Sequence, residues 1–199
     1  MAKTKRLSLM LIVVLVSFLG FITENIFIFI RFGFVDNRNM TLPFLLGYGL
    51  AILLIYLLFG TPQKPRFFTK ELTIKNKFIS MSYYFIICFL SVSIGELILG
   101  HMVEWICNIK WWNYSNIPLN ITRYTSVPTS TAFSLFITLF MRYLFSPLLS
   151  KFSKIPPKII FILTVTLIFL LSIDFIHSGI YMLINKHTLD LWKIEIKTQ

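Results

Sequence analysis

The stretch IIFILTVTLIFLLSIDFIHSGIYMLI, residues 159–184, is a long apolar run, and Asp174 and His177 are its only acidic or basic side chains. A bilayer core about 30 Å thick requires about 20 mostly apolar residues in a helix. The run therefore predicts a membrane-spanning helix, and the rest of the sequence can be interpreted around it.

Four further apolar runs precede it. Residues 7–30 are interrupted only by Glu24, residues 42–59 carry no charge, residues 78–104 carry Glu96 and Glu104, and residues 127–149 carry Arg142. None of them shows the strict alternation of a membrane barrel strand. The pattern predicts an all-α integral membrane protein, a bundle of five transmembrane helices that forms a single polytopic domain over residues 1–199.

The composition excludes the ordinary soluble class. Of the 199 residues, 56% are hydrophobic and 14% are charged, and the mean hydropathy is +0.78. Soluble domains carry about 25% charged residues. The formal net charge is +11, yet no basic stripe with interleaved aromatic residues lies outside the loops. The sequence therefore predicts a lipid bilayer as the surroundings and no nucleic-acid partner.

Basic residues predict the orientation, because cytoplasmic loops are enriched in Lys and Arg. With a cytoplasmic N-terminus, the outer segments hold Arg31, Arg38, Lys110, Arg123, Lys186, Lys193 and Lys197. The inner segments then hold the larger set, which is Lys3, Lys5, Arg6, Lys64, Arg66, Lys70, Lys75, Lys77, Lys151, Lys154 and Lys158. We expect the N-terminus to be cytoplasmic, and the basic loop 60–77 to lie on the anionic cytoplasmic leaflet.

Four of the 8 acids lie in or beside the apolar runs, and all four fall toward the expected outer face. Charges in a membrane span usually face the protein interior, pair with one another or mark a pathway. The four are Glu24, Glu96, Glu104 and Asp174, and the outer loops offer them Arg38 and Arg123. We expect a polar network there, either as a substrate site or as a set of ion pairs that only holds the helices together.

Two pairs at i, i+3 spacing have the residue types of metal ligands, His101 with Glu104 and Asp174 with His177. The chain has only 3 histidines and no H-E-x-x-H motif. We therefore expect no metal and no cofactor.

The sequence also suggests a parallel internal repeat. Glu24 is followed by Asn37-Arg38 and by Pro43, five residues after the arginine. Glu104 is followed by Asn120 and Arg123, and Pro128 again stands five residues later. A duplication would direct both outer loops toward one central site.

Several motifs together resemble a known family, the ABC-transporter permease proteins of the CmpB type. They are Gly20-x-x-x-Glu24, Phe34-Val35-x-Asn37-Arg38, Pro43, Gly47-Tyr48-Gly49, Glu96-Leu97-x-x-Gly100-x-x-x-Glu104, Trp111-Trp112-x-Tyr114-Ser115, Asn120 with Arg123, and Asp174-Phe175. The chain resembles a diverged member, because Asn113 and Thr122 stand where the family pattern has Asp and Gly. The resemblance adds Trp112, Tyr114 and Asn120 to the candidate site residues Glu24, Arg38, Glu96, Glu104, Arg123 and Asp174.

The resemblance implies a multi-pass permease-like subunit in the cell membrane that handles a small polar or amphiphilic substrate. No G-x-x-x-x-G-K-[ST] motif occurs in the chain, so a separate ATPase subunit would supply the energy, and a homo-oligomer would widen the pathway. Two alternatives stay open. One is a membrane-embedded enzyme that acts on a lipid or isoprenoid by carboxylate acid/base chemistry, and the other is a structural or regulatory membrane subunit. A non-enzymatic role is favoured, because no nucleophile can be identified.

Overall fold

The structure of the protein is a computed structural model that describes residues 2–195, with side chains from Thr4 onward. The chain divides into two compact units. Unit 1 comprises Met1–Leu53 and Leu149–Gln199, and unit 2 comprises Leu54–Leu148. Lys197 and the side chain of Lys3, which contribute to the orientation argument, lie outside the described residues. The orientation itself stays a prediction, as does the single domain.

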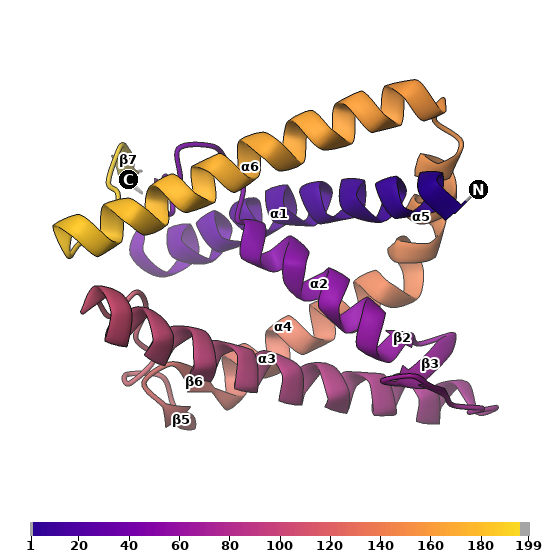
Figure 1. Ribbon diagram of the computed structural model, residues 1–199. Helices are drawn as coiled ribbons and strands as arrows, with labels where there is room; N and C mark the ends of the chain where they lie inside the picture. The colour runs from indigo at the N-terminus through magenta and orange to yellow at the C-terminus, as the bar shows by residue number, and fades with distance from the viewer. Residues whose placement is uncertain (1, 196–199) are drawn as a thin grey trace. The chain divides into compact units, whose positions relative to one another are not determined.

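Helices dominate the chain, as expected for the all-α membrane class. They are α1 (Ala2–Phe32), α2 (Leu46–Phe59), α3 (Lys77–Cys107), α4 (Val127–Leu139), α5 (Phe145–Ser153) and α6 (Pro157–Asn185), and a π-helical turn, η1 (Phe140–Leu144), joins α4 to α5 (Figure 1). Among the described residues, four helical segments are long and apolar enough to cross a membrane: Thr4–Phe32, Lys77–Cys107, Val127–Ser153 and Pro157–Asn185. The predicted fold class is confirmed.

Five spans were expected, but only four helical segments of the described residues have the length of a span, because the second apolar run forms a shorter helix than predicted. A helix over 42–59 was expected, but α2 begins at Leu46 and has 14 residues. Pro43 disfavours a helical conformation at Leu42. In addition, the Asp174 carboxylate accepts the backbone N–H groups of Thr41 and Leu42. The segment before α2 therefore forms a bend that is bonded to α6 instead of a helical turn.

In unit 1, α1 and α6 lie side by side and run in the same direction (Figure 1). Near their first residues, Thr4 and Lys158 line the same surface hollow. Farther along, Phe21 in the second half of α1 packs against Trp192, which follows α6, with ring centroids 6.5 Å apart. A buried core of Val13, Val14, Leu46 and Leu171 joins α1, α2 and α6. Strand β1 (Phe34–Asp36) pairs antiparallel with β7 (Lys193–Glu195), so the segment after α6 returns to the loop after α1.

In unit 2, α3 and α4 pack as an antiparallel pair. The first turn of α3 and the η1 turn both contact the short sheet that precedes α3, which consists of β2 (Gly60–Thr61), β3 (Lys64–Phe67) and β4 (Lys70–Glu71). At the opposite end, the hairpin of β5 (Asn120–Thr122) and β6 (Thr125–Ser126) leads into α4. Asn76 caps the start of α3 by accepting the N–H groups of Phe78 and Ile79, and Asn108 ends the helix in the left-handed conformation with φ 58°.

Gly49 allows the closest helix crossing in unit 1. It is buried, and a Cβ atom at this position would lie less than 3.0 Å from the Val13 carbonyl oxygen, the Ser17 hydroxyl and the Val13 side chain. Beside it, Leu45 donates its N–H to the carbonyl oxygen of Ser17 at 2.9 Å. Membrane helices that approach this closely need small residues, because lipid supplies little hydrophobic force to push them together.

The crossing gives a testable prediction. Gly49→Ala should destabilise the protein by about 1–3 kcal/mol, because the added methyl group forces α2 away from α1. Gly47→Ala is a matched control on the same helix, since a Cβ atom at Gly47 would meet nothing within 4 Å. The two melting temperatures are compared in the same detergent. A control that loses as much stability as Gly49→Ala would contradict the close crossing.

Candidate functional site

The first acid–arginine group lies in unit 1, at the part of α1 that carries Glu24. The hydroxyl of Tyr48 on α2 donates a hydrogen bond to the Glu24 carboxylate. Arg38, from the loop after β1, approaches the same carboxylate with Nη2 3.7 Å from Oε2. The predicted pair of Glu24 and Arg38 is therefore present. The structure adds Tyr48, which lies in the Gly47-Tyr48-Gly49 motif but was not predicted to be a site residue.

Local backbone geometry holds Arg38 in place. Asp36 accepts the Arg38 backbone N–H at 2.8 Å and pairs with Arg38 Nη1 at 3.3 Å, while its own N–H is bonded to Asn25 Oδ1 at 2.9 Å. Arg38 has φ 50°, in the left-handed region that a tight turn requires. Arg38 Nε is buried and has no hydrogen-bond partner among the described residues. One donor of the guanidinium is thus left for another group.

Asp174, the third predicted acid, lies on α6 in unit 1 and is 6% exposed. Its Oδ1 accepts the N–H of Thr41 and its Oδ2 accepts the N–H of Leu42, each at 2.9 Å. Both oxygens are therefore engaged by backbone donors, as a carboxylate at a helix N-cap is engaged. This geometry fits a structural role, in which Asp174 ties the segment before α2 to α6.

Two buried asparagines fasten the segment after α6 to the first loop. Asn37 donates through Nδ2 to the carbonyl oxygens of Met40 and Leu189, and its Oδ1 accepts the N–H of Leu191. Asn39 accepts the N–H of Leu189. No pattern in the sequence predicts this closure. Asn37 lies in the Phe34-Val35-x-Asn37-Arg38 motif, but nothing in its spacing indicates a partner more than 150 residues away.

The second acid–arginine group lies in unit 2. Arg123 Nη1 contacts Glu104 Oε1 at 3.1 Å, and His101 Nδ1 lies 3.9 Å from Glu104 Oε2. The ring of Tyr124 is fully buried and packs edge-on against His101, with centroids 5.0 Å apart. The predicted pair of Glu104 and Arg123 is thus present here too.

Tyr124 adds a buried hydroxyl to this group. Burial, and then the neighbouring Glu104 carboxylate, raise the pKa of Tyr124, so the hydroxyl stays protonated near neutral pH. The hydroxyl interacts with the Glu104 carboxylate, as the Tyr48 hydroxyl interacts with Glu24 in unit 1.

The Trp111-Trp112-x-Tyr114-Ser115 run holds the backbone beside the Glu104–Arg123 pair. The indole N–H of Trp112 donates to the Tyr124 carbonyl oxygen at 2.8 Å, and the N–H of Tyr114 donates to the Arg123 carbonyl oxygen at 2.7 Å. Asn120 is exposed and pairs with Ser126 in the β5–β6 ladder. The contacts of Trp112 and Tyr114 position the Arg123–Tyr124 segment, and Asn120 lies at the base of the hairpin.

Glu96 lies two turns before Glu104 on α3. It accepts a hydrogen bond of 3.4 Å from the hydroxyl of Ser130 on α4, and that hydroxyl also lies 3.1 Å from Thr125 Oγ1. Glu96 is therefore tied to α4 through the Ser130 hydroxyl. A carboxylate on an apolar helix needs such a polar partner within the protein.

The four acids are divided equally between the two units, with Glu24 and Asp174 in unit 1 and Glu96 and Glu104 in unit 2. Their assembly into one network stays a prediction. Within the described residues, no three His, Cys, Asp or Glu side chains gather as a ligand set for a metal ion. His177 is exposed while Asp174 is buried, so this pair does not converge on one point.

The two groups share one arrangement. In each, a glycine stands four residues before the glutamate, Gly20 before Glu24 and Gly100 before Glu104, on the same helix face. A Cβ atom at either glycine would fall within 3.0 Å of a tyrosine, Tyr48 at Gly20 and Tyr124 at Gly100. Each glycine thus makes room for a tyrosine ring beside a Glu–Arg pair. This shared geometry supports the predicted repeat, although the tyrosines occupy different places in the two loops.

Comparison with known sequences places these motifs within one family pattern. The sequence pattern of the family described as "Putative ABC-transporter type IV", CmpB type, matches residues 11–179. The match includes both glutamate–arginine groups and Asp174, and it ends before the segment that Asn37 and Asn39 hold. Searches of curated proteins and of solved structures find no match.

Asp174 gives a testable prediction. Asp174→Asn should lower the free energy of unfolding by about 2–3 kcal/mol, because an amide offers one acceptor oxygen where two backbone N–H groups need one each. Asp190→Asn is the matched control, since Asp190 is exposed and near the same end of α6. Thermal unfolding in detergent measures both. Equal melting temperatures for Asp174→Asn and the unmodified chain would contradict the structural role.

The glycine–tyrosine contact gives another prediction. Gly100→Ala should displace the Tyr124 ring and lower stability by about 1–3 kcal/mol through overpacking. A Cβ atom at Gly95, on the same helix, would meet nothing within 4 Å, so Gly95→Ala should leave stability nearly unchanged. Near-ultraviolet circular dichroism in detergent reports the tyrosine and tryptophan environment. An unchanged spectrum for Gly100→Ala would show that Tyr124 does not pack on Gly100.

Proposed function

Because the chain belongs to the ABC-transporter type IV family of the CmpB type, we propose that it is a multi-pass membrane subunit that handles a small polar or amphiphilic substrate. A separate ATPase subunit supplies the energy in this proposal. The membrane class rests on the family and on the four long apolar helices. The substrate site and the partner are the parts that we propose.

The observation that carries the proposal is that the Glu24–Arg38 group keeps one buried polar atom, Arg38 Nε, without a hydrogen-bond partner among the described residues. An unsatisfied buried polar group costs about 1–3 kcal/mol, so it is rare in native structures and calls for a ligand or an ordered water. A bound substrate with an oxygen acceptor would satisfy the Arg38 N–H. In unit 2, the Glu104–Arg123 pair has the same residue types beside a tyrosine hydroxyl, that of Tyr124.

Accessibility supports the same assignment. The side chains of Arg38 and Glu24 are 26% and 21% exposed, and those of Arg123 and Glu104 are 45% and 29% exposed. Both pairs are therefore reachable by a solute, unlike Asp174. Each lies near the end of a membrane-length helix, where a polar group can meet water on one side and lipid on the other. We assign Glu24, Arg38, Glu104 and Arg123 to substrate handling and Asp174 to structure.

The direction of the helices within each unit supports five membrane crossings. In unit 1, α1 and α6 run the same way, and α2 runs opposite to α1. In unit 2, α3 and α4 run in opposite directions, so together they return the chain to the side where α3 begins. For α6 to cross in the same direction as α1, α2 must also cross. Its 14 helical residues span about 21 Å, and the flanking segments 41–45 and 60–61 would complete the distance.

The separate ATPase is tested by purification. We expect the full chain, extracted from its native membrane in mild detergent, to co-purify with a protein that has a phosphate-binding loop and hydrolyses ATP. Mass spectrometry identifies the co-purifying chains. Recovery of the chain without any ATPase, while its own fold is intact, would contradict the proposed energy source.

The two sites are tested in that complex. Glu24→Gln and Glu104→Gln should each reduce the stimulation of ATP hydrolysis by a host metabolite extract about tenfold, because a charged hydrogen bond worth about 1.5–3 kcal/mol is lost. Glu195→Gln is the control, since Glu195 pairs with Lys193 on the exposed strand β7. Full stimulation in both site variants would contradict the assignment.

A further inference from the structure

The sheet between α2 and α3 is fastened to the helices more firmly than a connecting loop requires. The hydroxyls of Ser80 and Tyr84 on α3 donate to the carbonyl oxygens of Pro62 and Gly60. Tyr83 donates to the carbonyl oxygen of Arg66 at 3.1 Å. Three side chains of one helix therefore hold the backbone of the sheet.

Two further bonds fix the sheet from other elements. The Arg66 guanidinium donates to the Tyr56 carbonyl oxygen at 2.8 Å and lies over the Tyr56 ring, 5.8 Å from its centroid. The amide of Gln63 donates to the carbonyl oxygen of Arg142 in the η1 turn. A π-helical turn shifts the backbone bonding pattern and leaves a carbonyl oxygen available to such a partner. Residues 60–71, which we name the basic hairpin, are thus a preformed element.

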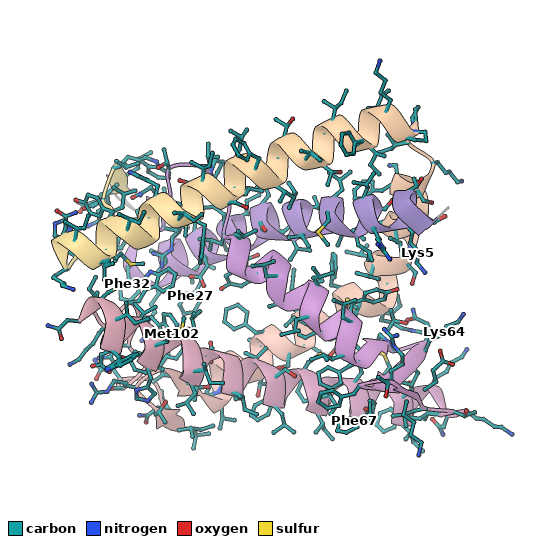
Figure 2. All side chains as sticks on the ribbon, in the orientation of Figure 1. Lys5, Phe27, Phe32, Lys64, Phe67 and Met102 are labelled. Atoms are coloured by element: carbon teal, nitrogen blue, oxygen red, sulfur yellow. The ribbon has the colours of Figure 1, made fainter. Side chains whose placement is uncertain are left out.

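The surface of the basic hairpin combines exposed cations with exposed aromatic rings. Lys64, Lys70 and the following Lys75 are exposed, and their ammonium groups form no ion pair with a described residue. Phe67 and Phe68 at its tip are 49% and 53% exposed, and their rings pack against each other with centroids 5.0 Å apart. Figure 2 shows Lys64 and Phe67 on this segment, beside the start of α3.

The position of the basic hairpin indicates which kind of molecule binds to its surface. It is immediately followed by α3, a candidate membrane span that begins at Lys77, so it must lie at a membrane–water boundary. Aromatic side chains at the membrane–water boundary insert among the lipid head groups, and lysines near the membrane surface attract anionic lipid phosphates. An acidic protein surface would also attract the lysines, but it would not require two exposed phenylalanines beside a membrane span.

We propose that the basic hairpin is a binding site for anionic phospholipid. Phe67 and Phe68 insert into the interfacial layer, and Lys64, Lys70 and Lys75 bind the lipid phosphates. The five hydrogen bonds to α2, α3 and η1 keep these groups in one geometry, which lowers the ordering cost of binding. On the expected orientation, the site faces the cytoplasmic leaflet, where anionic lipids are concentrated.

Insertion is tested with a spin label in the full chain. Phe68→Cys is labelled in nanodiscs of phosphatidylcholine that contain or lack phosphatidylglycerol, and Asn116→Cys in an exposed outer loop is the control. We expect the Phe68 label to become more accessible to oxygen and less accessible to a water-soluble nickel complex when phosphatidylglycerol is present, with the control unchanged. The native Cys88 and Cys107 are buried, so background labelling can be measured on the unmodified chain. A Phe68 label that stays in water in both nanodiscs would overturn the proposal and leave the hairpin to a protein partner.

Lipid preference is tested with charge-matched triple variants. In native mass spectrometry of the detergent-solubilised chain, Lys64→Gln/Lys70→Gln/Lys75→Gln should reduce the preference for phosphatidylglycerol over phosphatidylcholine at least tenfold, since each lysine near an anionic surface contributes about fivefold. Lys151→Gln/Lys154→Gln/Lys158→Gln removes the same charge elsewhere and should have a smaller effect. In the described part of the chain, the hydrogen bonds of these lysines come from their backbone atoms and not from their ammonium groups. Equal losses in the two variants would overturn the proposal, because the preference would then follow total charge and not the hairpin.

Discussion

Polar groups on apolar helices must find partners within the protein, because the bilayer interior offers none. The Asp174 carboxylate shows the constraint most directly, since its two oxygens accept the backbone N–H groups of Thr41 and Leu42. That contact holds a non-helical bend before α2 and so determines where α2 begins. The start of α2 in turn places Tyr48 beside Glu24 and Gly49 against α1. Much of unit 1 therefore depends on one buried acid.

Unit 2 meets the same constraint with other residues. Glu96 is satisfied by the Ser130 hydroxyl, and the backbone before α4 is held by Trp112 and by the Tyr114 N–H. In both units, small residues make the close contacts that bring these partners together. Gly20 and Gly100 leave space for the rings of Tyr48 and Tyr124, and a larger residue would separate each tyrosine from the glutamate one turn away. Packing and polar satisfaction are thus linked at the same helix turns.

The two glutamate–arginine pairs of the candidate site could be predicted, because charged residues are scarce in apolar runs and so stand out. Glu24 with Arg38 and Glu104 with Arg123 could be named because an intramembrane carboxylate needs a cation and each outer loop supplies few. Tyr48 and Tyr124 could not be selected from 8 tyrosines, since a tyrosine has no charge to require a partner and is common near membrane surfaces. Asp174 was expected at the site, but its oxygens accept backbone N–H groups. A pattern of side chains in the sequence does not indicate such partners.

The sequence by itself determined the membrane class, the family and the positions of the long helices, because each follows from local composition or from contiguous motifs. Only the tertiary structure decided that α2 is short, that the segment after α6 pairs with β1, and that residues 60–71 form a fastened sheet. These features rest on hydrogen bonds to backbone groups between residues far apart in the chain. Every residue carries the same backbone donors and acceptors, so their long-range partners leave no trace in the sequence.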